Sequence, residues 1–312
     1  MIRKLELLGI AFPSWSLGTR KTFLCVLSFG KGIDMVTTRN NLPPSPRVMG
    51  ILNVTPDSFW DGGRFTGREA ALAQARRMAK EGADIIDVGG ESTRPGAAWV
   101  SEQEELDRVI PVIRAIRGEL PIRLSIDTSR PRVMREAVAA GADIINDVRA
   151  LQIEGALETA SELVHGFGVR VCLMHMQGDP ATMQTAPVYE DVVETVRGFL
   201  LARIAACEAR GIPRARLWVD PGFGFGKTLD HNLALLAGLD RLVALGPPVL
   251  VGLSRKSLFG ALLDKPVEER LAGSIAGALA AVTRGAAVVR VHDVGATVDA
   301  LTVWRAVSER GA

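Results

Sequence analysis

Cysteine, histidine and tyrosine are scarce in this sequence. Its 312 residues include three cysteines, four histidines and one tyrosine. An odd number of widely spaced cysteines cannot form a disulfide framework, and the cysteine and histidine spacings match no zinc site. We therefore interpret Cys25, Cys172 and Cys207 as reduced thiols of a cytoplasmic protein. The shortage of aromatic residues, beside 32 glycines, favours close packing of helices on strands over an aromatic-rich β-sandwich.

Long apolar runs and an excess of one charge are also missing. No stretch approaches the ~18 apolar residues that a membrane span needs. Because 37 basic residues face 35 acidic ones, the net charge of +2 produces no field that would steer the chain onto nucleic acid. With 47% hydrophobic and 23% charged residues, the composition is typical of a soluble globular protein. We expect no membrane or nucleic-acid partner, and any anion site must be local.

Residues 1–46 differ from the rest of the chain. Their pattern is irregular, and the proline-rich stretch at 43–46 marks a boundary. We expect an irregular N-terminal extension over 1–46 and one domain over 47–312. Two alternatives for the extension stay open: a targeting segment, and a true start at Met35 or Met49.

Short apolar runs rich in β-branched residues recur along the domain. We count eight, at 48–52, 85–88, 122–126, 144–145, 169–174, 217–219, 249–253 and 288–291. Helical patterns lie between them, with capping boxes expected at Thr66 with Glu69 and at Ser101 with Glu104, and a long helix over 191–210. Eight strand-then-helix units predict a single (β/α)8 barrel, because an open doubly wound sheet usually has fewer strands.

Polar residues follow the predicted strands, where the active sites of such barrels lie. Asp127, Asn146 and Asp220 end the third, fourth and sixth runs and would project toward one central mouth. Their amide and carboxylate groups match a heterocycle with an N–H, a ring nitrogen and an exocyclic amine, such as an aminopyrimidinone. A magnesium or manganese site is the competing interpretation of the two aspartates.

Basic residues gather after the last two runs. Ser254-Arg255-Lys256 follows the seventh run, and Arg290 and His292 share one side of the eighth. An arginine fork beside a histidine suits a diphosphate, and Arg94 can add a third donor. A solvated salt bridge is the ordinary role of any one arginine, whereas three converging basic groups favour an anion site.

The glycine-rich segment 220–228 does not match a phosphate loop. Pro221 stands where the Walker A pattern needs its first glycine. The segment instead supplies a carboxylate, glycines that allow a close backbone approach, and Phe225 to cover a flat ligand. Two polar loops, 53–63 with Trp60 and 91–96, have the composition of lids over a substrate.

Taken together, these motifs resemble the dihydropteroate synthase family of pterin-binding enzymes. The matching segments, which run from about Val48 to the C-terminus, are GILNVTPDSF at 50–59, DVGGESTRPG at 87–96, SIDT at 125–128, INDV at 145–148, MHMQG at 174–178, DPGFGFGK at 220–227, GLSRKS at 252–257 and RVHD at 290–293. The family's fold is a (β/α)8 barrel that is usually dimeric, which agrees with the strand count.

The resemblance implies an activity and the residues that carry it. The enzyme would join (7,8-dihydropterin-6-yl)methyl diphosphate to p-aminobenzoate, releasing diphosphate, with Mg²⁺ as cofactor and sulfonamides as inhibitors. The implied roles are the pterin for Asp127, Asn146, Asp220 and Lys256, magnesium for Asn53, the diphosphate for Arg94, Arg290 and His292, and the aminobenzoate for Thr93, Pro95, Phe225 and Ser254.

No residue is placed to activate the weakly nucleophilic arylamine, so we expect the diphosphate to leave first, as in an SN1 reaction. Asp127 would stabilise the resulting cation, with Lys256, Arg290 and His292 as the other catalytic residues. Three alternatives are weighed against this hypothesis: a Schiff-base aldolase using Lys256, a pterin-dependent methyltransferase, and a catalytically silent paralogue. The anion set argues against the methyltransferase, and the intact polar set against the paralogue.

Overall fold

The computed structural model describes residues 45–54, 64–91, 100–179 and 182–310, and the account below concerns these residues. The lid loop around Trp60, the N-terminal extension up to residue 44 and Cys25 lie outside them. No helix in the described ranges is long and apolar enough to cross a membrane.

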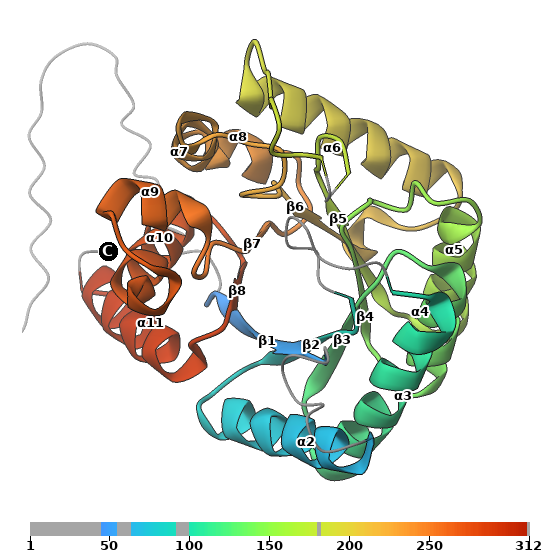
Figure 1. The fold of residues 1–312 in the computed structure, drawn as a ribbon. Coiled ribbons are helices and arrows are strands. Elements are labelled where there is room, and N and C mark those ends of the chain that lie inside the picture. The colour runs from blue at the N-terminus through green and yellow to red at the C-terminus, as the bar shows by residue number, and fades with distance from the viewer. Residues whose placement is uncertain (1–44, 55–63, 92–99, 180–181, 311–312) are drawn as a thin grey trace, which may run out of the picture. The chain divides into compact units, whose positions relative to one another are not determined.

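Eight parallel strands form one sheet in the order β6-β5-β4-β3-β2-β1-β8-β7. A parallel bridge between Val219 and Val249 joins the two ends of this order, so that the sheet closes into a ring (Figure 1). The strands are β1 (Arg47–Asn53), β2 (Ile85–Gly89), β3 (Arg123–Asp127), β4 (Ile144–Asp147), β5 (Arg170–Met174), β6 (Leu217–Asp220), β7 (Leu250–Val251) and β8 (Val288–Val291). The predicted (β/α)8 barrel is confirmed.

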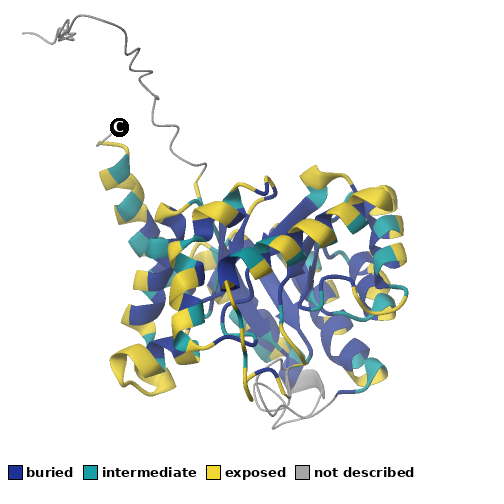
Figure 2. Cartoon of the chain, turned by 90° about the horizontal axis from the view of Figure 1, so that it is seen from above, coloured by how far each residue is buried: buried dark blue, intermediate teal, exposed yellow. Residues whose placement is uncertain are grey.

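Helices surround the ring of strands (Figure 1). They are α2 (Arg64–Lys80), α3 (Glu102–Glu119), α4 (Pro131–Ala139), α5 (Ala156–Phe167), α6 (Val192–Ala209), α7 (Leu229–Ala237), α8 (Leu239–Val243), α9 (Ser257–Leu263), α10 (Leu271–Thr283) and α11 (Val294–Ser308), with 3-10 turns η3 (Arg214–Arg216) and η4 (Val267–Glu269). Figure 2 shows the strands buried in the interior and the exposed residues on the outer faces of the helices.

One of the two expected capping boxes is wrong. Helix α2 begins at Arg64, so Thr66 already lies in its first turn, whereas an N-cap residue must precede the first helical residue. Ser101 caps α3 as expected, since its side chain accepts a hydrogen bond from the backbone N–H of Glu104 at 3.2 Å. Asp191 likewise caps α6, which ends one residue before Arg210.

The inside of the barrel changes from apolar to polar along the strands. A cluster separate from the main core comprises Met49, Ile85, Ile144, Cys172, Trp218, Leu250 and Val288. Side chains two positions further along a strand point to the same face. In these seven strands those residues are Ile51, Asp87, Asn146, Met174, Asp220, Gly252 and Arg290. Four of these seven residues, Asp87, Asn146, Asp220 and Arg290, are charged or polar, so a largely polar layer follows the apolar cluster toward the carboxyl ends of the strands.

Candidate active site

A cavity of about 810 Å³ opens at the carboxyl ends of the strands. Its lining includes seven residues expected from the sequence, namely Asn53, Asp127, Phe225, Ser254, Lys256, Arg290 and His292. They come from β1, β3, β8 and the loops that follow β6, β7 and β8. The barrel thus brings together groups that lie more than 200 positions apart in the chain, as between Arg290 and Asp87.

Arg290 is the centre of this site. Its Nε donates to Asp87 Oδ2 at 2.6 Å, and its Nη2 donates to Asp127 Oδ2 at 2.8 Å. The Asp87 side chain is 0% exposed, whereas that of Arg290 keeps 20% exposure toward the cavity. The guanidinium therefore neutralises buried charge below it and still presents a basic group to a ligand.

Asp87 also orients the amide of Asn146. The Nδ2 of Asn146 donates to Asp87 Oδ2 at 3.2 Å. An ionised carboxylate only accepts hydrogen bonds, so this contact requires the amide nitrogen and not its oxygen to face Asp87. The amide oxygen is therefore not the atom that contacts Asp87.

Asn146 and Asp220 lie in the polar layer beneath the cavity lining, at 4% and 6% exposure. Asp220 Oδ1 accepts the backbone N–H of Gly222 at 2.7 Å. Burial raises the pKa of the Asp220 carboxyl, while the charge of Lys256 opposes the rise. Lys256 and Asp220 both contact the loop that follows β6, Lys256 through the Phe223 carbonyl oxygen and Asp220 through the Gly222 N–H.

Asp127 has a strongly shifted acidity. Burial raises the pKa of its carboxyl to about 7, the positive charge of Arg290 opposes the rise, and the nearby Asp87 adds to it. Two carboxylates share one guanidinium here, so the second negative charge is only partly compensated. Asp127 therefore changes charge near neutral pH.

Lys256 reaches across the cavity to the loop that follows β6. Its Nζ donates to the carbonyl oxygen of Phe223 and lies 4.5 Å from the centroid of the Phe225 ring. Burial lowers the pKa of the Lys256 amine to about 8, with Asp220 opposing the shift. Lys256 thus interacts with both the Asp220 carboxylate and the Phe225 ring.

Ser254 and His292 form a pair at the rim. Ser254 Oγ accepts the backbone N–H of His292 at 3.1 Å and lies 3.0 Å from its Nδ1. The contact holds His292 against Ser254 on the wall of the cavity that Arg290 also lines. This arrangement agrees with an anion site built from Arg290 and His292.

Asn53 ends β1 and lines the same cavity. Within the described ranges no group of three or more His, Cys, Asp or Glu side chains is arranged to hold a metal ion. Thr93, Arg94 and Pro95 lie outside the described residues, so their expected contacts stay predictions.

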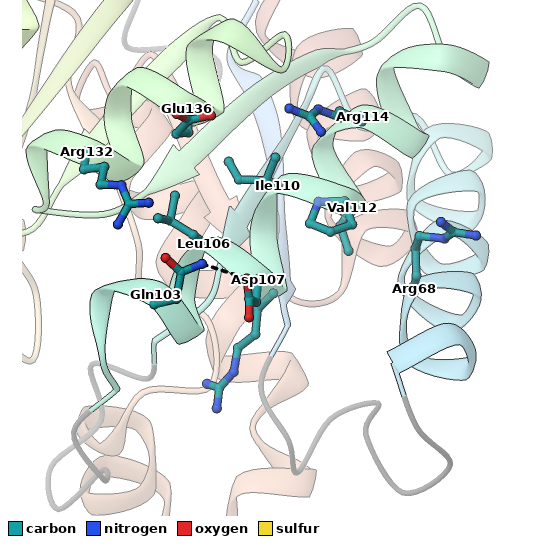
Figure 3. A pocket seen from close by; sticks show the side chains of 11 residues that line it. Arg68, Gln103, Leu106, Asp107, Ile110, Val112, Arg114, Arg132 and Glu136 are labelled. Atoms are coloured by element: carbon teal, nitrogen blue, oxygen red, sulfur yellow. Dashed lines mark hydrogen bonds between the residues drawn. The ribbon is translucent and has the colours of Figure 1, made fainter.

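A second hollow of about 500 Å³ lies on the outer helical layer. Figure 3 shows Arg68 on one side of α3 and Arg132 with Glu136 on the other. Asp107 Oδ1 accepts a hydrogen bond from Gln103 at 2.9 Å within it. No residue from a strand end lines this groove, so we assign the candidate site to the barrel mouth.

Two functional features were missed from the sequence. Asp87 appeared only inside a motif, yet an acidic residue two positions after Ile85 in an otherwise apolar strand is a signal for an inward charge. The second is a buried contact at 3.0 Å between Lys227 Nζ and His175 Nδ1. No local pattern predicts that contact.

Fold and site together define a (β/α)8 barrel with a cavity of charged and polar residues at the carboxyl ends of its strands. The family model for pterin-binding enzymes matches residues 49–292. Dihydropteroate synthase of Haemophilus influenzae is 55% identical over 261 residues, which cover 84% of this chain and 94% of that protein. The chain therefore belongs to the family of pterin-binding enzymes.

Solved structures agree with this assignment. Dihydropteroate synthase of Yersinia pestis, in complex with a sulfonamide drug, is 51% identical with a TM-score of 0.80, over 86% of this chain and 95% of that one. The enzyme of Xanthomonas albilineans, with 4-aminobenzoic acid, is 56% identical with a TM-score of 0.79, over 84% and 93%. The match extends over the whole barrel.

The buried carboxylate of Asp87 should stabilise the fold through Arg290 and Asn146. We expect Asp87→Asn to lower the free energy of unfolding by about 1–3 kcal/mol, because a charged hydrogen bond in a dry layer is lost. Urea titration followed by circular dichroism measures the change. Glu119→Gln is the control, since it weakens an exposed pair with Arg76. Equal losses in the two variants would contradict the role of Asp87.

Proposed function

We propose that this chain is a dihydropteroate synthase. It joins (7,8-dihydropterin-6-yl)methyl diphosphate to p-aminobenzoate, releases diphosphate and forms 7,8-dihydropteroate for folate biosynthesis. The observation that carries the proposal is the single cavity lined by Asp127, Lys256 and Arg290, with Asn146 joined to Arg290 through Asp87. The relatives that share the barrel over more than four fifths of this chain support the same activity.

The polar layer binds the pterin edge. Asp220 and Asp127 accept hydrogen bonds from ring N–H and amine groups, while the Asn146 oxygen, oriented by Asp87, accepts from the exocyclic amine. Lys256 donates to the pterin carbonyl oxygen and ring nitrogen. Each donor of an aminopyrimidinone thereby meets an acceptor, which disfavours analogues that lack the amine.

The rim binds the two remaining groups. Arg290 and His292, together with Arg94, hold the diphosphate. Phe225 covers the aryl ring of p-aminobenzoate and Ser254 lies near its carboxylate, with Thr93 and Pro95 completing that pocket. Sulfonamides, which mimic p-aminobenzoate, compete for the same space.

The amide oxygen of Asn53 fits a magnesium ion that binds together with the substrate. Asn53 offers an amide oxygen, and Mg²⁺ commonly takes few protein ligands and completes its shell with water and phosphate oxygens. When bound, the ion supplies positive charge that stabilises the departing diphosphate. The residues present therefore fit a metal that binds together with the substrate.

The reaction begins with departure of the diphosphate. The bond between the pterin methylene carbon and the diphosphate oxygen breaks, and Arg290 and His292 neutralise charge on the leaving group. The ionised Asp127 stabilises the cation that remains on the pterin. The amine of p-aminobenzoate then forms the new carbon–nitrogen bond and loses a proton to solvent. No covalent enzyme intermediate forms.

The alternatives account for less of the site. A methyltransferase of the same family gives no role to the anion-binding pair of Arg290 and His292. An aldolase would use Lys256 as a nucleophile and leave the layer of Asn146 and Asp220 without a ligand. A silent paralogue has no need to keep a buried arginine between two carboxylates.

We further propose that residues 47–312 act as the catalytic barrel of a cytoplasmic homodimer. The supporting observation is the set of large apolar side chains left exposed on the outer face of the barrel, including Leu262 at 52% and Val307 at 67%. Sedimentation equilibrium should give twice the chain mass of 33.4 kDa. A single-chain mass at micromolar concentration would contradict the dimer.

The purified protein, given the pterin diphosphate, p-aminobenzoate and magnesium, should release diphosphate and form coupled product in equal amounts. Asp220→Ala should raise the KM for the pterin substrate by about tenfold or more, because a buried ring N–H loses its acceptor. His292→Ala should instead lower kcat. Unchanged kinetics in both variants would contradict the residue roles, and absence of product with the unaltered chain would contradict the activity.

Asp127 should produce an acid limb in the pH profile. Its pKa of about 7 means that the carboxylate gains a proton as the pH falls through that value, and the neutral acid cannot stabilise the cation. We expect kcat/KM to fall below pH about 7. Asp127→Asn, measured with the same substrates, should be slow at every pH and lack this limb. A limb that persists in the variant would assign it to another group.

A further inference from the structure

Lys227 is a buried lysine that the proposed reaction does not use. Its residue is 3% exposed, and it follows the glycine-rich loop that begins after β6. Its Nζ donates to the carbonyl oxygens of Gly222 at 2.9 Å and Phe225 at 3.0 Å, and it lies 3.0 Å from His175 Nδ1. The ammonium thus joins both ends of the loop to the segment that follows β5.

The number of acceptors matches the charged form of the lysine. An ammonium carries three N–H donors and no acceptor, so His175 must be neutral with a lone pair on Nδ1. Burial and the charge of Lys227 lower the pKa of His175 to about 3, which keeps the ring neutral. Burial and Lys256 lower the pKa of Lys227 to about 7, and Asp220 opposes that shift. Loss of one proton leaves one of the three acceptors without its donor.

The loop cannot obtain this shape from other residues. Gly222 has φ +69°, and a Cβ there would lie 1.8 Å from the carbonyl oxygen of His175. Gly226, with φ +63°, would place a Cβ 2.6 Å from the carbonyl oxygen of Gln177. The backbone therefore packs directly on the segment after β5, and its carbonyl groups turn inward to Lys227.

The outer side of the same loop faces the candidate active site. Lys256 donates to the Phe223 carbonyl oxygen and contacts the Phe225 ring. The loop is held between two ammonium groups, one buried and one in the cavity. The position of the Phe225 ring therefore depends on carbonyl groups that Lys227 holds from behind.

We propose that Lys227, with His175 as its acceptor, is a positioning residue that sets the affinity for p-aminobenzoate by holding the 222–225 loop in place. The ligand named here rests on the proposed function, whereas the order of the loop does not. Asp127 and Asn146 come from other strands and do not depend on the loop, whereas Asp220, which accepts the Gly222 N–H, and Lys256, which donates to Phe223, contact it directly.

The first test replaces Lys227 with the similarly sized Met. We expect Lys227→Met to raise the dissociation constant for p-aminobenzoate, measured by calorimetry in the presence of pterin and diphosphate, by about tenfold, because two carbonyls and a ring nitrogen lose their donor. The KM for the pterin substrate should rise by a smaller factor, because Asp127 and Asn146 lie on β3 and β4 and only Asp220 and Lys256 contact the loop. Lys80→Met, on the exposed end of α2, is the control.

Amide hydrogen exchange measures the order of the 222–225 loop in the absence of any ligand. In Lys227→Met the amides of 222–226 should exchange faster, while those of β3 and β4 keep their wild-type rates. As the pH rises through about 7, the wild-type loop should lose protection relative to the variant, because only the wild type loses a donor at this site. Asp127 and Lys256 are present in both proteins, so the difference between them reports the Lys227 charge together with the groups on which it acts, His175 and Asp220.

A second pair of variants covers the case in which Lys227→Met does not fold. His175→Leu removes the acceptor and should loosen the loop and weaken p-aminobenzoate, whereas His175→Gln keeps an acceptor oxygen and should restore both. Wild-type exchange and affinity in Lys227→Met, or in His175→Leu, would overturn the positioning role. A loosened loop in a chain that makes no dihydropteroate would overturn the proposed function alone.

Discussion

One guanidinium buried between two carboxylates determines how this barrel works. Arg290 binds Asp87 and Asp127 across the inside of the ring, and Asp87 in turn binds Asn146. Residues from four strands, β2, β3, β4 and β8, therefore hold the Arg290 guanidinium in one position. Removing Arg290 would leave two neighbouring carboxylates without a cation, which costs far more than an exposed ion pair contributes. Other arrangements of these four side chains would separate the opposite charges, so the electrostatic interactions favour the one observed.

Much of the architecture could be predicted from local pattern. Eight apolar runs became eight strands, and Ser101 and Asp191 capped the helices expected after them. The error at Thr66 shows the limit of such signals, since a capping pattern four residues long cannot tell whether the helix has already begun. Strand ends were predicted well because buried runs stop where polar residues begin.

The site was predictable in its residue types and not in its pairings. Asp127, Asn146 and Asp220 follow strands, so their convergence follows from the barrel. Which carboxylates meet Arg290 depends on the register between neighbouring strands. This register pairs Arg290 with Met49 and Asp87 with Ser125. Lys227 depends on a backbone turn, and its acceptors are carbonyl groups that every residue type carries. Neither the partners of Arg290 nor the acceptors of Lys227 can therefore be predicted from the spacing of residues in the sequence.

The seam between β6 and β7 has a consequence for the aromatic wall. β7 comprises Leu250 and Val251, and it meets β6 through the bridge at Val219 and Val249. The loops that leave these two strands carry Phe225 and Lys256, on either side of that seam. Fewer paired residues join β6 to β7 than join any other two neighbouring strands in the described part of the barrel, so this seam is its weakest junction. A change in the spacing of β6 and β7 would therefore alter the separation of the loops that carry Phe225 and Lys256, whereas Asp87 and Asp127 lie on β2 and β3, away from this seam.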